Sequence, residues 1–272
     1  MDQLFLILSL LGVGAVAGFL GVLLGIGGGV VMVPALIALL DATGLMSGAQ
    51  VTLVAVATSL SCVLATSASA AQAQIAAGKV LWPIVYRWSL PLMVGAALSA
   101  LIARALPMAT LRLLIAAFLL FVALVMLTRW QPDPRQQMPR RGLAALLGLG
   151  CGTVSGLAGI GGGNVIVPTL LYFNTPIHRA TATSSTLGVP VALAGLAGYL
   201  WIGWRTPVAA DLPGLYGYLY LPATGALLLA AVSLAPVGVK AAHRMDPAPL
   251  RRVFGALLLL VAGRMAYSAL GS

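Results

Sequence analysis

Residues 14–34 read GAVAGFLGVLLGIGGGVVMVP, and a matching stretch returns at residues 148–168 as GLGCGTVSGLAGIGGGNVIVP. The two stretches lie 134 positions apart, and each carries the run GIGGG followed five positions later by a proline. Self-similarity at a fixed offset is the mark of an internal repeat. The recurrence therefore predicts two homologous halves.

Each GIGGG run interrupts an otherwise apolar segment. Adjacent glycines weaken a helix and leave backbone groups without intrahelical partners. Hydrocarbon cannot hydrogen bond to these groups, so such an interruption must lie against protein or beside a cavity. We therefore expect two glycine breaks inside the protein, with half-helices that begin after Gly29 and Gly163.

The composition predicts an all-α, polytopic integral membrane protein. Of the 272 residues, 61% are hydrophobic, only 20 are charged, and the mean hydropathy is +1.06. Long apolar runs recur throughout, and the longer ones approach the roughly 20 residues needed to cross a bilayer. They cover residues 4–24, 51–71, 90–103, 111–127, 215–239 and 253–270.

The charged residues and cysteines argue against several other classes. The net charge of +10 comes from Lys and Arg scattered at the ends of apolar runs, which favours topology signals over nucleic-acid binding. Cys62 and Cys151 have no partners at metal-ligand spacing, and no nucleophile stands with a base. We expect no enzyme activity, no cofactor and no metal site.

The chain divides into a first membrane repeat (residues 1–130), a linker rich in Pro and Arg (131–141) and a second membrane repeat (142–272). The repeat extends beyond the glycines, because residues 182–185 match residues 57–60 at an offset of 125. Residues 41–48 are expected to form a loop, and all five acidic residues to lie in loops or at the terminus. Aromatic residues are expected at the membrane interfaces: Trp82, Tyr86, Trp88, Trp201, Trp204, Tyr216, Tyr218 and Tyr220.

Two topologies remain open, with eight or ten membrane segments. Eight segments distribute Lys and Arg almost evenly between the two sides. If the chain reverses at each glycine break, ten segments result, and all cations fall on one side except Arg104, Arg112, Arg205 and Arg264. This second topology follows the positive-inside rule and makes the halves inverted repeats of five segments each.

The interior offers hydrogen-bond donors and no carboxylate, which favours an anion site over a sodium or proton pathway. The candidate substrate-binding residues are Gly27, Gly28, Gly29, Thr58, Ser59, Gly161, Gly162, Gly163, Asn164, Thr183, Ser184 and Ser185. Two structural alternatives stay open. Glycines four apart also serve close helix packing, and Ser and Thr also bond back to their own helices.

The doubled GIGGG motif, together with Ala57-Thr-Ser-Leu and His178-Arg-Ala-Thr-Ala-Thr-Ser-Ser, resembles the sulfite exporter TauE/SafE family, also called toluene sulfonate uptake permeases. The resemblance implies a multi-pass carrier in the bacterial inner membrane for sulfite, sulfonates or sulfoacetate. One departure is Leu81, where relatives often have an acidic residue. Alternatives are a carrier for thiosulfate or a small carboxylate, and a membrane scaffold or assembly factor. Besides its anion and the bilayer, the chain has no predicted partner, and self-association stays open.

Overall fold

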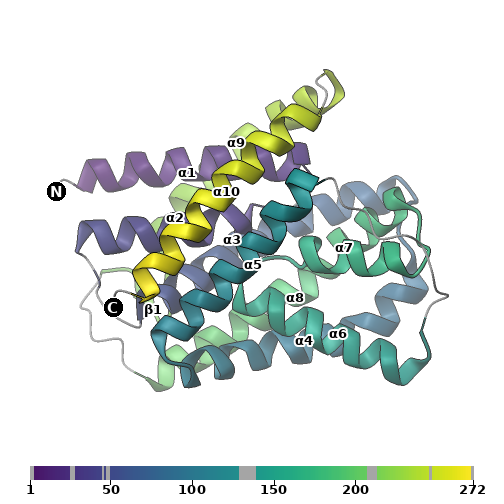
Figure 1. Cartoon of the computed structure of the whole chain (residues 1–272), viewed down its shortest axis with the longest axis horizontal. Coiled ribbons are helices and arrows are strands. Elements are labelled where there is room, and N and C mark those ends of the chain that lie inside the picture. Colours follow the sequence, from purple (N-terminus) through teal and green to yellow (C-terminus); the bar gives the residue numbers. More distant parts are fainter. Residues whose placement is uncertain are drawn as a thin grey trace.

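The computed structural model describes residues 3–24, 28–44, 46, 50–128, 139–206, 213–244 and 247–270. These residues form ten helices and one short hairpin, which confirms the all-α polytopic class (Figure 1). Within the described residues, five helices are long and apolar enough to cross a membrane. The elements are α1 (Gln3–Leu24), α2 (Gly29–Thr43), α3 (Gln50–Ala76), α4 (Trp82–Ala105), α5 (Met108–Thr128), α6 (Arg141–Leu157), α7 (Gly163–Tyr172), α8 (Ile177–Arg205), β1 (Leu215–Tyr216), β2 (Leu219–Tyr220), α9 (Leu221–Arg244) and α10 (Pro247–Leu270).

The chain folds back at both glycine breaks. Gly28 lies against Ala17, about two turns before the end of α1, and Gly162 lies against Ser155 near the end of α6. The half-helices α2 and α7 begin at Gly29 and Gly163, which confirms the predicted starts. The described residues therefore contain separate helices on either side of each break rather than one continuous crossing. Residues 25–27, including the candidate Gly27, and most of the linker lie outside the described residues.

The two sequence halves interleave in space. Helix α1 of the first half packs along α9 of the second, and α6 of the second packs along α4 of the first. Glycines make both approaches close. A Cβ added at Gly18 would lie 2.5 Å from the Cα of Ala231, and one at Gly152 would overlap the carbonyl oxygen of Leu92. The structure thus supports the packing interpretation for these glycines.

The same contacts recur at constant sequence offsets. Gly18 and Gly152 are 134 positions apart, and their neighbours Ala231 and Leu92 are 139 apart. One turn earlier, Gly14 lies against Leu227, and Gly148 lies against the backbone of Trp88. The two glycines are again 134 positions apart, and their neighbours are again 139 apart. The contact between α1 and α9 therefore matches the contact between α6 and α4 residue by residue.

Replacing Gly152 by alanine is expected to destabilise the protein. The new methyl would overlap the Leu92 backbone, which cannot move without separating α4 from α6, at a cost of about 2 kcal/mol. Gly150 is the matched control, because a Cβ there meets nothing within 4 Å. Thermal melting in detergent should fall for Gly152→Ala and stay level or rise for Gly150→Ala. Equal melting of the two variants would contradict the close α4–α6 contact.

The aromatic residues divide between surface and core. Trp82 and Tyr86 are exposed and stack with ring centroids 5.7 Å apart. Trp88, also predicted at the interface, is instead 0% exposed. Residues four apart share one face of a helix, whereas Trp88 belongs to the buried cluster that α4 forms with α6, α7 and α8. The interfacial prediction was wrong for this residue.

The connection between α8 and α9 also packs into the protein. Tyr218 and Tyr220 of the hairpin are buried, which contradicts their predicted interfacial position, whereas Tyr216 is exposed. The hairpin approaches α8 closely, because a Cβ added at Gly203 would lie 2.5 Å from the Tyr218 nitrogen. Asp41 is likewise not in a loop, since α2 continues to Thr43.

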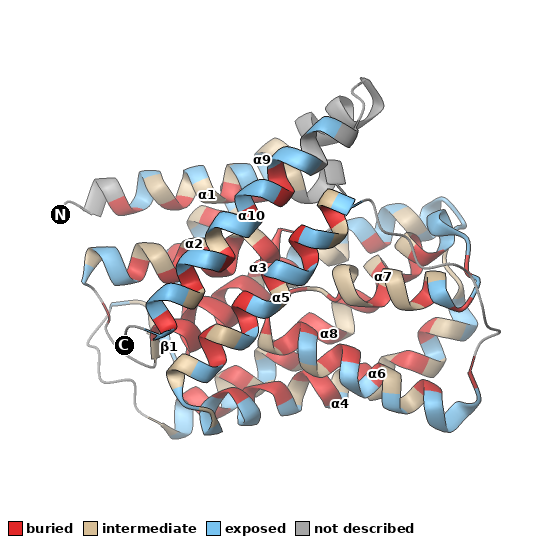
Figure 2. Ribbon diagram, in the orientation of Figure 1, coloured by how far each residue is buried: buried red, intermediate tan, exposed pale blue. Residues whose placement is uncertain are grey.

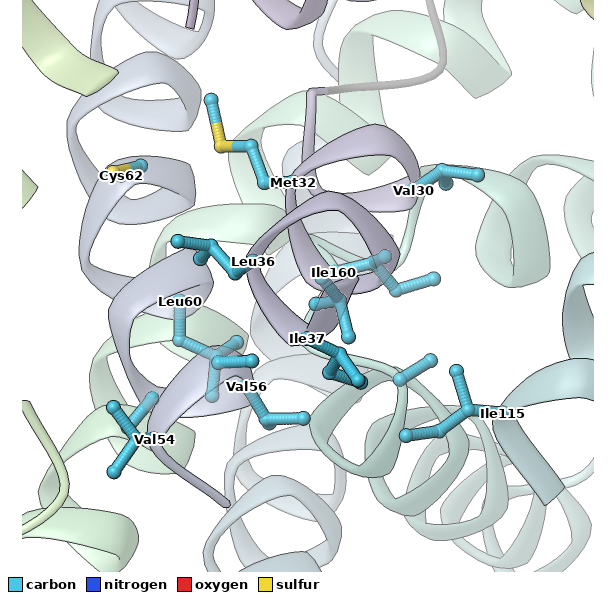
Figure 3. Close-up of a cluster of buried hydrophobic side chains, with 14 of the residues drawn as sticks. Val30, Met32, Leu36, Ile37, Val54, Val56, Leu60, Cys62, Ile115 and Ile160 are labelled. Atoms are coloured by element: carbon cyan, nitrogen blue, oxygen red, sulfur yellow. The ribbon is translucent and has the colours of Figure 1, made fainter. Parts of the chain in front are cut away.

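The main hydrophobic core surrounds α2 and α3 (Figures 2 and 3). Side chains of α2, such as Leu36 and Ile37, face those of α3, such as Val56 and Leu60. Ile160, from the second glycine break, lies in the same cluster and is 2% exposed. The second break is therefore anchored in the core of the first half.

Candidate functional site

The second glycine break is a tight turn between α6 and α7. Gly159 and Gly162 adopt φ values of +66° and +82°, in the left-handed region that favours glycine. The Ile160 N–H donates to the Ser155 carbonyl at 2.9 Å, and the Gly159 N–H donates to that of Gly156 at 3.4 Å. The first part of the turn is thus held by hydrogen bonds to α6.

The second part of the turn leaves donors free. The N–H groups of Val165 and Ile166 both donate to the Gly162 carbonyl. The N–H groups of Gly161 and Gly163 find no acceptor among the residues that the structure describes. Gly161 and Gly163 are half-buried rather than sealed. Two backbone donors and the positive end of the α7 dipole therefore meet at this point.

Helix α3 forms one side of the break. The Ser59 hydroxyl donates to the Gly159 carbonyl at 2.8 Å and is fully buried. Further along α3, the hydroxyl oxygen of Ser67 would lie 3.0 Å from a Cβ at Gly161. Ser67 is half-buried, so its hydroxyl lies beside the free donors without being enclosed.

Helix α8 closes the other side through Gly188. A Cβ at Gly188 would lie 2.9 Å from the Gly161 carbonyl oxygen and 2.8 Å from the Ser67 hydroxyl oxygen. Ser184 precedes Gly188 by four residues and shares its helix face. Ser184 is 2% exposed, and its hydroxyl oxygen has no hydrogen-bond partner within the described part of the chain. An unpaired buried hydroxyl is costly, and native proteins rarely keep one without a role.

The first glycine break meets the second. A Cβ at Gly29 would lie 2.6 Å from the Gly159 carbonyl oxygen and 3.1 Å from the Ile160 Cα. Gly28 is buried against α1. The candidate Gly29 therefore adjoins the second break, where it allows two backbones to touch, whereas Gly28 packs against α1.

Three further candidate hydroxyls hydrogen bond to the protein itself. Thr58 accepts from the Tyr220 N–H at 3.2 Å, and Thr183 accepts from the Leu81 N–H at 3.0 Å. Each bond joins a hydroxyl-rich helix of one half to the residue before a long helix of the other half, α9 for Thr58 and α4 for Thr183. Ser185 donates back to the Thr181 carbonyl at 3.0 Å, as the back-bonding alternative predicts.

The sequence model of the family described as Sulfite exporter TauE/SafE matches residues 10–265. The chain belongs to this family. It is 29% identical over 262 residues to a probable membrane transporter protein of Haemophilus influenzae, with 96% of this chain and 98% of the relative covered. It is 28% identical over 262 residues to a probable membrane transporter protein of Methanocaldococcus jannaschii, with 94% of each covered. No solved structure matches.

This TauE/SafE protein is thus a multi-pass membrane transporter and not an enzyme, as the sequence predicted. Within the described ranges, no three His, Cys, Asp or Glu residues come together as a metal site would require. Both cysteines are free and buried. The chemistry of the transporter's candidate site is therefore that of backbone N–H groups and hydroxyls.

Sequence reasoning missed Ser67 in this transporter. The repeat offset of 125 places Ala192 opposite it, so the duplication holds no signal for this serine. Its position beside Gly161 depends on how α3 crosses the break. Asn164, a candidate from the sequence, is the second residue of α7 and is half-buried at the same turn.

Proposed function

We propose that this protein exports small sulfur-containing oxyanions, such as sulfite, sulfonates or sulfoacetate, across the bacterial inner membrane. The observation that carries the proposal is the pair of unpaired N–H groups at Gly161 and Gly163, at the start of α7. Ser67 and Ser184 extend this set of donors with hydroxyls. The name of the matching family supports sulfite as the first anion to test.

A helix N-terminus with free N–H groups attracts an anion. The α7 dipole places about half a positive charge there, and backbone donors satisfy the oxygens of a compact oxyanion. The proposed site consists of Gly161–Asn164, Ser67 and Ser184, and none of these residues carries a positive charge. The anion would therefore be held by neutral hydrogen-bond donors, from which it can be released. A carrier needs a site that binds well enough to load and weakly enough to release.

The depth of the break suits a transport site. Helix α7 has 10 residues and extends about 15 Å, which is half of a hydrocarbon core of about 30 Å. Its other end leads to the exposed residues Asn174, His178 and Arg179, which suit the membrane surface. This length supports a position of the Gly163 end of α7 near the middle of the membrane, where carriers bind their substrates.

Alternating access follows in this proposal from two inverted halves that meet at the breaks. The recurring contacts of α1 with α9 and of α6 with α4 support this arrangement, as do the matching bonds of Thr58 and Thr183. In inverted-repeat carriers, one set of helices rocks against the other around a central site. A negative-inside potential adds about 2.3 kcal/mol per charge per 100 mV in favour of anion export.

Replacing Ser67 by alanine is expected to weaken transport without unfolding the protein. A hydroxyl bonded to a charged ligand contributes about 1.5 kcal/mol or more, so KM for sulfite should rise about tenfold. Sulfite flux into proteoliposomes measures this. Ser185→Ala is the matched control, because the Ser185 hydroxyl is bonded to its own helix. The same KM in the wild type, Ser67→Ala and Ser184→Ala would remove this site from the proposal.

A panel of anions tests the substrate class separately. A ligand that binds only the folded protein raises its melting temperature. Sulfite, a sulfonate and sulfoacetate should raise it more than thiosulfate or acetate, and Ser67→Ala should reduce the shift. A larger shift with thiosulfate or a carboxylate would identify another anion as the substrate. The absence of any shift and of any flux would favour a scaffold.

A further inference from the structure

A groove lies between α2 and α10, away from the glycine breaks. Its volume is about 460 Å³, within the range of small-molecule sites. One wall is an apolar face of α2 that includes Pro34 and Ile37, and the other is a face of α10 that includes Phe254, Leu258 and Val261. All lining residues belong to these two helices, so the groove is separate from the proposed substrate site.

One end of the groove is polar. Asp41, Arg264 and Ser268 line it there, near the last turns of α2 and α10. The Arg112 guanidinium, on α5, bonds to both carboxylate oxygens of Asp41, at 3.0 and 3.2 Å. This ion pair compensates the charge of Asp41. Arg264 is exposed and has no ion-pair partner among the residues described, so a single uncompensated cation remains at this end.

The groove has the length and surroundings of a lipid site. The α2 wall runs from Val31 to Ala42, about 16 Å, which equals roughly one leaflet of the hydrocarbon core. Next to the groove, α10 exposes the apolar side chains of Val253, Leu257 and Leu260, a face suited to contact with the acyl chains of the bilayer (Figure 2). Lipid chains therefore reach the groove directly from the bilayer.

We propose that this groove binds one anionic phospholipid. One acyl chain lies between α2 and α10, and the phosphate pairs with Arg264. Arginine donates in a fork that matches phosphate, and basic residues between membrane helices bind anionic headgroups. An apolar trough with one free cation at its end suits this amphiphile, whereas a small inorganic oxyanion would leave the apolar walls empty.

The test is native mass spectrometry of the detergent-purified transporter with phosphatidylglycerol or phosphatidylcholine added. The wild type should retain one phosphatidylglycerol with about fivefold preference, the effect of one basic residue near the membrane surface. Arg264→Gln should abolish the preference, and Arg264→Lys should keep much of it. Arg205→Gln is the matched control, because Arg205 is also exposed near a helix end but packs over Trp201.

A second variant tests the apolar walls. Ala38→Phe fills the groove without changing its charge, so it should reduce retention of both lipids. Unchanged preference in Arg264→Gln, or equal loss in Arg205→Gln, would overturn the proposal. A dimer whose interface covers the groove and excludes lipid would also overturn the proposal. Release of the bound lipid by added sulfonates would do the same. None of these outcomes depends on whether the protein transports sulfite.

Discussion

Replacing Gly29 by valine is expected to leave little folded transporter in the membrane. A Cβ at this position would lie 2.6 Å from the Gly159 carbonyl oxygen and 3.1 Å from the Ile160 Cα. Both neighbours are backbone atoms of the second break, and Ile160 is fixed in the core around α2 and α3. Relief of the overlap would have to displace the whole turn, at a cost of about 3 kcal/mol or more.

Purified yield and melting temperature in detergent measure this effect. Gly12→Val is the control, since Gly12 lies in α1 and a Cβ there meets nothing within 4 Å. Valine at position 12 should fold like the wild type. A Gly29→Val protein with normal yield and melting would show that the two breaks do not touch.

Removing Asp41 is expected to cost more stability than removing Arg112, although both changes break the same ion pair. The Arg112 side chain is 11% exposed and that of Asp41 is 39% exposed. Asp41→Ala leaves a buried guanidinium whose one remaining partner among the described residues is Thr52, at 3.3 Å, and should cost about 3 kcal/mol. Arg112→Met leaves a carboxylate that reaches water, so the loss should be nearer 1 kcal/mol.

The double variant Asp41→Ala/Arg112→Met separates charge burial from packing. It should melt at a higher temperature than Asp41→Ala alone, because the unpaired charge has been removed with its partner. Additive losses in the double variant would contradict a direct pairing of the two side chains. Equal losses in the two single variants would contradict the unequal burial.

The glycine pattern predicted much of this fold because its causes are local. The start of a half-helix after GIGGG follows from the backbone freedom of glycine, and α2 and α7 begin where that reasoning places them. The packing of Gly18 and Gly152 was also open to prediction, since small residues four apart permit close helix contact. The sequence did not predict which helices these glycines contact, because α9 and α4 are far from Gly18 and Gly152 along the chain.

The hydroxyl residues show where pattern reasoning stops. Thr58, Ser59 and Ser184 look alike in the sequence, yet Thr58 and Ser59 are bonded within the protein and Ser184 has no partner in the described structure. Trp88 and Tyr86 look like two interfacial aromatics, and one of them is buried. Such differences depend on the rotation of each helix and on the neighbour it meets.

The sequence by itself determined the membrane environment, the doubled glycine break and the family, because hydropathy and repeated motifs are properties of the chain. Only the tertiary structure decided that the breaks touch, that Ser67 stands beside Gly161 and that a groove separates α2 from α10. These are contacts between helices distant in the chain. Their geometry follows from how all the helices pack together, which no local pattern encodes.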